Sequence, residues 1–174
     1  MDITEINRLE TNTDVGVIIG DTNAPKAIIE FVNLRCPYCR EWFKKSKEII
    51  DQAVKDKKAY RVIKLFDKEK ESLQRGNVMH RYVTKGDTKK AFADITRIYE
   101  TQDQWGNLEL EEVAKFAEQQ LSLENYEDSL TTEAIIDEAE RANIRFVPTI
   151  IIEDKIFDES VDLEDLKRYI ESES

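Results

Sequence analysis

The sequence predicts an α/β fold in which an inserted α-helical domain interrupts the core. Short apolar runs typical of strands occur near both ends of the chain, whereas apolar residues at three- and four-residue spacing, typical of helices, fill the middle. Only five Gly and three Pro occur in 174 residues, which argues against long flexible linkers between separate domains. We therefore expect one core from residues 1–66 and 144–174 and a helical insertion from residues 67–143.

Three strands and one helix are expected in the first part of the core. The second strand is continuously apolar apart from Glu30, as is typical of a strand covered on both faces. Pro37 suits the first position of the helix, because the N–H that proline lacks has no helical partner there. The strands are expected at residues 15–19, 26–33 and 60–66, and the helix at residues 37 to about 57.

The expected insertion consists of helices separated by breaks that contain glycine. Gly86-Asp87 and Gly106-Asn107 interrupt the helical spacing, and Asp87 and Asn107 are expected to cap the helices that follow them. The helical segments are expected near residues 68–85, 87–103 and 108–121, followed by a helix over residues 130–142.

The second part of the core contains two more strands and a closing helix. The strands are expected at residues 146–152 and 155–157, joined by a tight turn at Glu153-Asp154. An amphipathic helix is expected over residues 161–170. The complete order is therefore strand, strand–helix–strand, several helices, and then strand–strand–helix.

The charge of the chain restricts its partners. Its 26 basic and 37 acidic residues give a formal net charge of −11, which argues against nucleic acid or an anionic membrane as the main partner. The first residues lack the basic start and apolar run of a secretory signal, and no apolar stretch approaches the roughly 20 residues that span a bilayer. We expect a monomer that works in the cytoplasm, with no nucleic-acid or membrane partner.

Cys36 and Cys39, the only cysteines of the chain, stand at the expected junction between the second strand and the helix that follows it. A C-x-x-C sequence at such a junction is the thioredoxin-type redox signature. The N-terminus of a helix favours a thiolate over a thiol, and the thiolate is the species that attacks a disulfide. We expect Cys36 to be the nucleophile and Cys39 to resolve the mixed disulfide.

Two alternatives for the cysteine pair are inert buried thiols and half of a metal site. A structural zinc site usually needs four protein ligands, and two Cys and one His cannot supply them within one chain. A metal or cluster shared between two chains stays open, although we expect neither metal nor organic cofactor. The single histidine, His80, would have to lie beside Cys36 in a Cys–His hydrolase. We interpret it instead as an ordinary helix histidine.

Glu30 interrupts an apolar strand six residues before Cys36. A buried carboxylate is costly and tends to hold its proton. A protonatable acid beneath Cys39 would accept the proton of that thiol as its sulfur attacks. The alternatives are an edge position that faces solvent and a partner for a buried lysine.

Val147-Pro148-Thr149 opens the strand expected near the end of the chain. Proline removes a hydrogen-bond donor from a sheet, so its presence at the start of an apolar strand needs a reason. A cis Val147–Pro148 peptide beside the two sulfurs would supply one, and it would present the backbone of Val147 to an extended substrate.

These motifs resemble the DsbA-like branch of the thioredoxin superfamily. The resemblance rests on Ile28-Ile-Glu-Phe-Val-Asn-Leu-Arg-Cys-Pro-Tyr-Cys39, on Leu123-Glu-Asn-Tyr-Glu-Asp-Ser-Leu130 and on Val147-Pro148-Thr149. It implies a thioredoxin fold with an inserted α-helical domain. It also implies that Cys36 is the nucleophile, Cys39 the resolving cysteine, Glu30 the buried acid and Pro148 the cis-proline.

The substrate groove and the missing signal are the points where the chain departs from that branch. Pro37, Tyr38, Phe146 and Val147 are expected to contact substrate, with a merely exposed aromatic as the alternative for Tyr38. Because Asn143 and Phe146 stand where glycines are common, the groove is expected to be narrower. The missing secretory signal favours a reductase, isomerase or redox relay inside the cell.

We interpret the chain as a thiol–disulfide oxidoreductase that exchanges disulfides with the thiols or disulfides of proteins. A separate redox partner would recycle the cysteine pair. One rival is a redox-regulated binding adaptor without turnover, in which the helical insertion docks a partner. The other rival is a carrier of a metal or cluster bridged between two C-x-x-C pairs.

Overall fold

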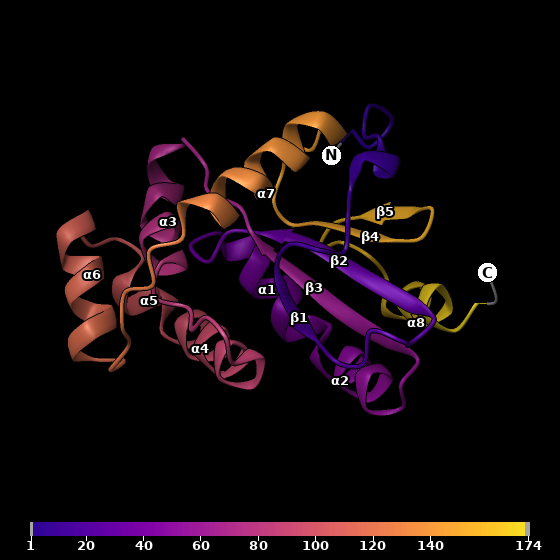
Figure 1. The fold of residues 1–174 in the computed structure, drawn as a ribbon, viewed down its shortest axis with the longest axis horizontal. Coiled ribbons are helices and arrows are strands. Elements are labelled where there is room, and N and C mark those ends of the chain that lie inside the picture. Colours follow the sequence, from indigo (N-terminus) through magenta and orange to yellow (C-terminus); the bar gives the residue numbers. More distant parts are fainter. Residues whose placement is uncertain (1, 173–174) are drawn as a thin grey trace.

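A five-stranded mixed sheet lies at the centre of residues 2–172, which the structure, a computed structural model, describes (Figure 1). The strands are β1 (Val17–Ile19), β2 (Lys26–Val32), β3 (Ala59–Leu65), β4 (Thr149–Ile152) and β5 (Lys155–Phe157). Their order across the sheet is β1-β3-β2-β4-β5. Strands β2 and β3 are parallel, and the other neighbouring pairs are antiparallel.

Helices cover both faces of the sheet, because the central strand β2 is apolar on both. The helices are α1 (Pro37–Lys45), α2 (Lys47–Lys55), α3 (Gln74–His80), α4 (Thr88–Glu100), α5 (Gln102–Trp105), α6 (Leu110–Gln119), α7 (Ser129–Ala142) and α8 (Leu163–Glu171), with 3-10 turns η1 (Arg8–Glu10) and η2 (Glu71–Leu73). Ile28 of β2 packs in one apolar cluster with α1, α2 and α8. Ile29 and Phe31 pack in another with α7, on the opposite face.

The single helix expected from residue 37 to about 57 is instead two helices, α1 and α2, which meet at Ser46. The Ser46 hydroxyl donates a hydrogen bond of 2.7 Å to the carbonyl oxygen of Trp42, one turn earlier. Such back-bonding competes with the helical backbone and often bends a helix. The spacing of apolar residues does not reveal this bond, so the expectation of one unbroken helix was wrong.

Helices α3 to α6 lie together at one end of the sheet, on the left of Figure 1, and α7 returns from them across the sheet. A continuous apolar cluster joins these helices to the core. It contains both cysteines together with Tyr99 of α4 and Trp105 of α5. The inserted helices therefore form one wall of the region around the thiols.

One of the two predicted helix caps in the insertion is confirmed. The side chain of Asp87 accepts a hydrogen bond of 3.1 Å from the N–H of Lys90 and caps α4. The cap predicted at Asn107 was wrong, because α6 begins at Leu110. Asn107 instead accepts a hydrogen bond of 3.1 Å from Arg35, in the loop before the cysteines.

Strand β4 begins at Thr149 rather than at residue 146 as expected. Phe146 and Val147 precede the strand, and Pro148 offers no N–H for pairing with β2. The Val147–Pro148 peptide bond is cis. These three residues consequently form a turn at the end of the sheet where α1 begins.

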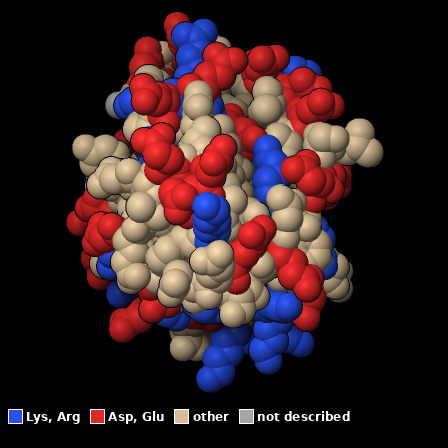
Figure 2. Space-filling view, turned by 90° about the vertical axis from the view of Figure 1, so that its left-hand side faces the viewer, with Lys and Arg blue, Asp and Glu red and all other residues tan. Residues whose placement is uncertain are grey.

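The surface of the inserted helices is mixed in charge. Figure 2, which views the left-hand end of Figure 1, shows acidic side chains scattered over this face, with Lys and Arg side chains near its centre, at its top and in a group at its lower edge. None of the helices in the described part of the chain is both long and apolar enough to cross a membrane.

Candidate active site

The two cysteines lie at the N-terminus of α1. Cys36 is the N-cap residue, Pro37 lies in the first turn, and both sulfurs are free thiols. Cys36 is 5% exposed, whereas Cys39 is completely buried. The Cys36 thiol donates a hydrogen bond of 3.6 Å to the carbonyl oxygen of Val147. The structure thus brings the predicted cysteine pair together with the turn that contains Val147 and Pro148.

Hydrogen bonds at the helix terminus stabilise the thiolate of Cys36. A hydrogen bond from the Cys39 side chain is the largest influence on the pKa of Cys36 and lowers it, while burial raises it. The backbone N–H groups of Cys39 and Tyr38, which belong to the first helical turn, lower it further, so the pKa is about 7. A substantial fraction of Cys36 is therefore thiolate at neutral pH.

Cys39 has the opposite ionisation behaviour. Burial raises its pKa well above the usual value, and the hydrogen bond and negative charge of Cys36 raise it further. The N–H of Asn33 donates to the Cys39 sulfur at 3.4 Å, which partly opposes this rise. The nucleophile predicted from the sequence therefore ionises first, while the other thiol holds its proton.

We expect iodoacetamide to alkylate the reduced protein at Cys36 with half of the maximal rate near pH 7. Only the thiolate reacts, so below that midpoint the rate should fall about tenfold for each unit of pH. Mass spectrometry after digestion identifies the modified residue, and the protein unfolded in urea serves as the control. A midpoint near 9.0, the unperturbed value, would contradict the geometry described for Cys36.

Glu30 is 1% exposed on β2, but it does not lie alone as a protonatable acid. Arg61 of β3 donates to its two oxygens from Nε at 2.8 Å and from Nη2 at 2.6 Å, and Trp42 Nε1 donates at 2.8 Å. Three donors and one full positive charge satisfy the ionised carboxylate. The buried partner considered for Glu30 is therefore present, as Arg61 in place of a lysine. Proton transfer from Cys39 to Glu30 stays a prediction.

Tyr99 is a buried group near the site that sequence reasoning missed. Its hydroxyl has no hydrogen-bond partner among the described residues, and its ring lies 5.0 Å from that of Phe43. The guanidinium of Arg61 lies 5.3 Å from the Phe43 ring on the same side of the sheet. Burial raises the pKa of Tyr99 well above its usual value, and the nearby Cys39, Cys36 and Glu30 add to that effect. Hydrogen bonding in this interior is therefore incomplete.

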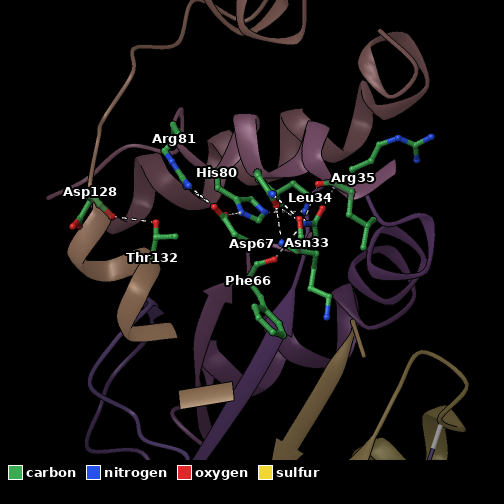
Figure 3. Close-up of polar contacts among 12 residues, drawn as sticks. Asn33, Leu34, Arg35, Phe66, Asp67, His80, Arg81, Asp128 and Thr132 are labelled. Atoms are coloured by element: carbon green, nitrogen blue, oxygen red, sulfur yellow. Dashed lines mark hydrogen bonds and ion pairs between the residues drawn. The ribbon is translucent and has the colours of Figure 1, made fainter. Parts of the chain in front are cut away.

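The loop that leads to Cys36 is held by side chains far away in the sequence (Figure 3). The side-chain amide of Asn33 donates to Asn77 at 3.1 Å. Gln102 donates to the carbonyl oxygen of Leu34 at 2.8 Å, and His80 accepts from the N–H of Leu34 at 3.1 Å. The position of the nucleophile thus depends on helices α3 and α5 of the insertion.

A groove of about 730 Å³ opens beside the Cys36 sulfur. It is lined by all four residues predicted to contact substrate, Pro37, Tyr38, Phe146 and Val147. Tyr38 and Phe146 are 58% and 54% exposed, so their rings are available to a bound chain. The groove also carries charged side chains of both signs: Asp67, Lys68, Glu69, Lys70, Glu140 and Arg145. The lining of the groove thus combines exposed aromatic rings with charges of both signs.

The other cavity of note lies away from the sulfurs. It measures about 270 Å³ and lies between β1, the start of α4 and the start of α7. Within residues 2–172, no group of three or more His, Cys, Asp and Glu side chains is arranged to hold a metal ion.

A C-x-x-C pair at the start of a helix, facing a cis-proline turn on a mixed sheet with helices on both faces, defines a protein with the thioredoxin fold. A thioredoxin family model matches residues 12–172, and the chain belongs to this family. The predicted thioredoxin fold with inserted helices is confirmed, as is the recognition of the chain as DsbA-like.

Solved structures place the chain among similar proteins. It is 54% identical to a conserved protein of unknown function from Enterococcus faecalis V583, with 98% of each chain covered and a TM-score of 0.97. Oxidised BdbD from Bacillus subtilis is 15% identical, with 95% of this chain and 94% of that chain covered and a TM-score of 0.67. ScsC from Proteus mirabilis is 21% identical, with 93% and 73% covered and a TM-score of 0.70. The last two likenesses show the fold alone, and no curated protein matches the chain.

Proposed function

We propose that this chain is a thiol–disulfide oxidoreductase that acts on the thiols or disulfides of proteins. The observation that carries the proposal is the unequal ionisation of the two thiols at the mouth of the groove. The pKa of Cys36 is lowered to about 7, and that of the buried Cys39 is raised well above its usual value. A ready nucleophile beside a protonated second thiol is the arrangement that two-step exchange needs.

In the reducing direction, the Cys36 thiolate attacks one sulfur of a substrate disulfide. A Cys36–substrate bond forms, the substrate S–S bond breaks, and the departing substrate sulfur takes up a proton. Cys39 then loses its proton and attacks the Cys36 sulfur, which forms the Cys36–Cys39 disulfide and releases the second substrate thiolate. Two electrons pass from the cysteine pair to the substrate. A separate reductant restores the pair, and oxidation of a substrate dithiol follows the same steps in reverse.

The direction of exchange depends on how strongly the reduced form is stabilised. A pKa of about 7 at Cys36 matches the nucleophile of thioredoxin more closely than the far more acidic cysteine of a strong oxidant. We therefore propose that the chain acts as a reductase, isomerase or relay. We also propose that it acts as a monomer in the cytoplasm. An equilibrium titration against glutathione tests the direction.

The Cys39→Ser variant tests the exchange reaction itself. Because a serine hydroxyl at this position cannot resolve the mixed disulfide, the variant should retain covalent protein partners that dithiothreitol releases. The Cys36→Ser/Cys39→Ser double variant is the matched control and should retain none. Equal recovery of partners by both variants without a disulfide link would support the adaptor alternative and contradict the oxidoreductase.

A further inference from the structure

His80 makes two hydrogen bonds from inside the protein, and together they determine where its proton lies. It is 3% exposed at the end of α3. Its Nε2 lies 3.1 Å from the backbone nitrogen of Leu34, and its Nδ1 lies 2.8 Å from Oδ1 of Asp67 (Figure 3). The Leu34 N–H can only donate, so Nε2 must accept and carry no proton. The neutral ring therefore holds its proton on Nδ1 and donates it to Asp67.

Asp67 is the group that selects this tautomer. Burial raises its pKa, but the hydrogen bonds from His80 and Arg81 and the positive charge of Arg81 outweigh burial and lower it overall. Asp67 is thus a carboxylate and can only accept from the ring. It also lines the groove beside Cys36, so the chain of contacts runs from the groove wall through His80 to the loop.

Leu34 is the point at which this chain of contacts reaches the cysteines. The residue before it, Asn33, donates its N–H to the Cys39 sulfur at 3.4 Å. The same residue accepts the N–H of Cys36 on its carbonyl oxygen at 3.0 Å. Leu34, whose N–H His80 accepts, therefore lies between Asn33, which contacts the Cys39 sulfur, and Cys36, which carries the other sulfur.

The surroundings of His80 favour the neutral ring that this contact requires. Burial lowers its pKa most, Asp67 raises it, and the positive charges of Arg81 and Lys85 lower it again, so the pKa is lowered overall. Protonation would place an Nε2–H against the Leu34 N–H and break the bond. Both ring nitrogens of the buried His80 make hydrogen bonds. An apolar side chain could fill the same space but could make neither bond.

We infer that His80, oriented by Asp67, is a positioning residue for disulfide exchange, which holds the Leu34 peptide so that the Cys36 sulfur stays at the amide-lined start of α1. The inference rests on the proposed function for its biological meaning. Its test uses the reduced protein and does not need turnover, so its failure can be told apart from failure of the proposed function.

The test compares the pH profile of Cys36 alkylation in the wild type with that in His80→Leu and His80→Gln. Without an acceptor for Leu34, the loop should relax and the sulfur should lose part of its amide contacts. In His80→Leu the midpoint should therefore rise from about 7 by about 0.5–1 pH unit, toward the unperturbed 9.0. The glutathione equilibrium should move toward the disulfide form of the protein. His80→Gln, whose amide oxygen can accept, should recover at least half of both changes.

Two further variants keep the outcome decisive. Asp67→Asn keeps the shape of the side chain but removes the carboxylate that fixes the ring proton on Nδ1, because an amide can present either its NH2 or its oxygen to the ring, so the midpoint should rise here also, by less than in His80→Leu. Tyr82→Phe removes a hydrogen bond of 2.7 Å to Glu118 elsewhere in the insertion and should leave the midpoint unchanged. His80→Leu decides the outcome if it folds, and Asp67→Asn decides it otherwise. If that variant lowers stability without moving the midpoint or the glutathione equilibrium, His80 is only a packing residue and the inference is wrong.

Discussion

Replacing Cys36 by Ser is expected to abolish disulfide exchange in both directions. A serine hydroxyl is not ionised near neutral pH, so the variant lacks the nucleophile that makes the first bond. Cys39 cannot take its place, since it is completely buried and its pKa is raised well above the usual value. Reduction of insulin by the variant and oxidation of a dithiol peptide should both fall by at least about 10³-fold, a loss comparable in kind to removal of other catalytic nucleophiles.

The matched variant is Cys39→Ser, which keeps the nucleophile and loses only the resolving thiol. It should still react once with a model disulfide in a single turnover, whereas Cys36→Ser should not react at all. Near-normal insulin reduction by Cys36→Ser would remove the basis of the proposed function, whatever the behaviour of the second variant.

Replacing Arg61 by Leu is expected to lower the free energy of unfolding by about 3–5 kcal/mol, because it leaves the carboxylate of Glu30 buried without its cation. Both side chains of the pair are 1% exposed. Although burial opposes it, the charge and hydrogen bonds of Glu30 raise the pKa of Arg61, so the guanidinium keeps its charge in the native protein. Urea denaturation followed by fluorescence measures the change, with an unchanged slope showing that the unfolded state is the same.

Two comparisons isolate the effect of the unpaired charge. Adding Glu30→Gln to Arg61→Leu should recover much of the loss, because glutamine carries no charge and its oxygen can still accept from Trp42. Breaking the exposed pair of Lys47 and Asp51 by Lys47→Leu should change stability by less than about 0.5 kcal/mol. An Arg61→Leu protein as stable as the Lys47→Leu protein would show that the buried pair does not matter for folding.

Local chemistry made several features of this chain predictable. Cys36 and Pro37 come a few residues after the strand, and helical spacing follows them, so the thiols were expected at a strand–helix junction. The strong apolar pattern of residues 26–33 likewise predicts the buried strand observed as Lys26–Val32. The helix cap at Asp87 needs only the backbone N–H of Lys90, three residues later, so it could be predicted from the local sequence. The break at Ser46 was missed, because a hydroxyl that bonds back to Trp42 leaves the apolar spacing intact.

The sequence alone determined that a reactive cysteine pair begins a helix after a buried strand, and that helices separate the two parts of the sheet. Tertiary structure decided which groups surround that pair. Strands β2 and β3 are parallel neighbours, and Glu30 pairs with Ile63, which follows Arg61 by two residues. Arg61 therefore lies on the same face of the sheet as Glu30 and reaches its carboxylate. His80 meets Leu34, 46 residues away along the chain, because α3 lies against the loop that follows β2. Such contacts depend on how separate elements cross in space, and no local pattern of residues records that crossing.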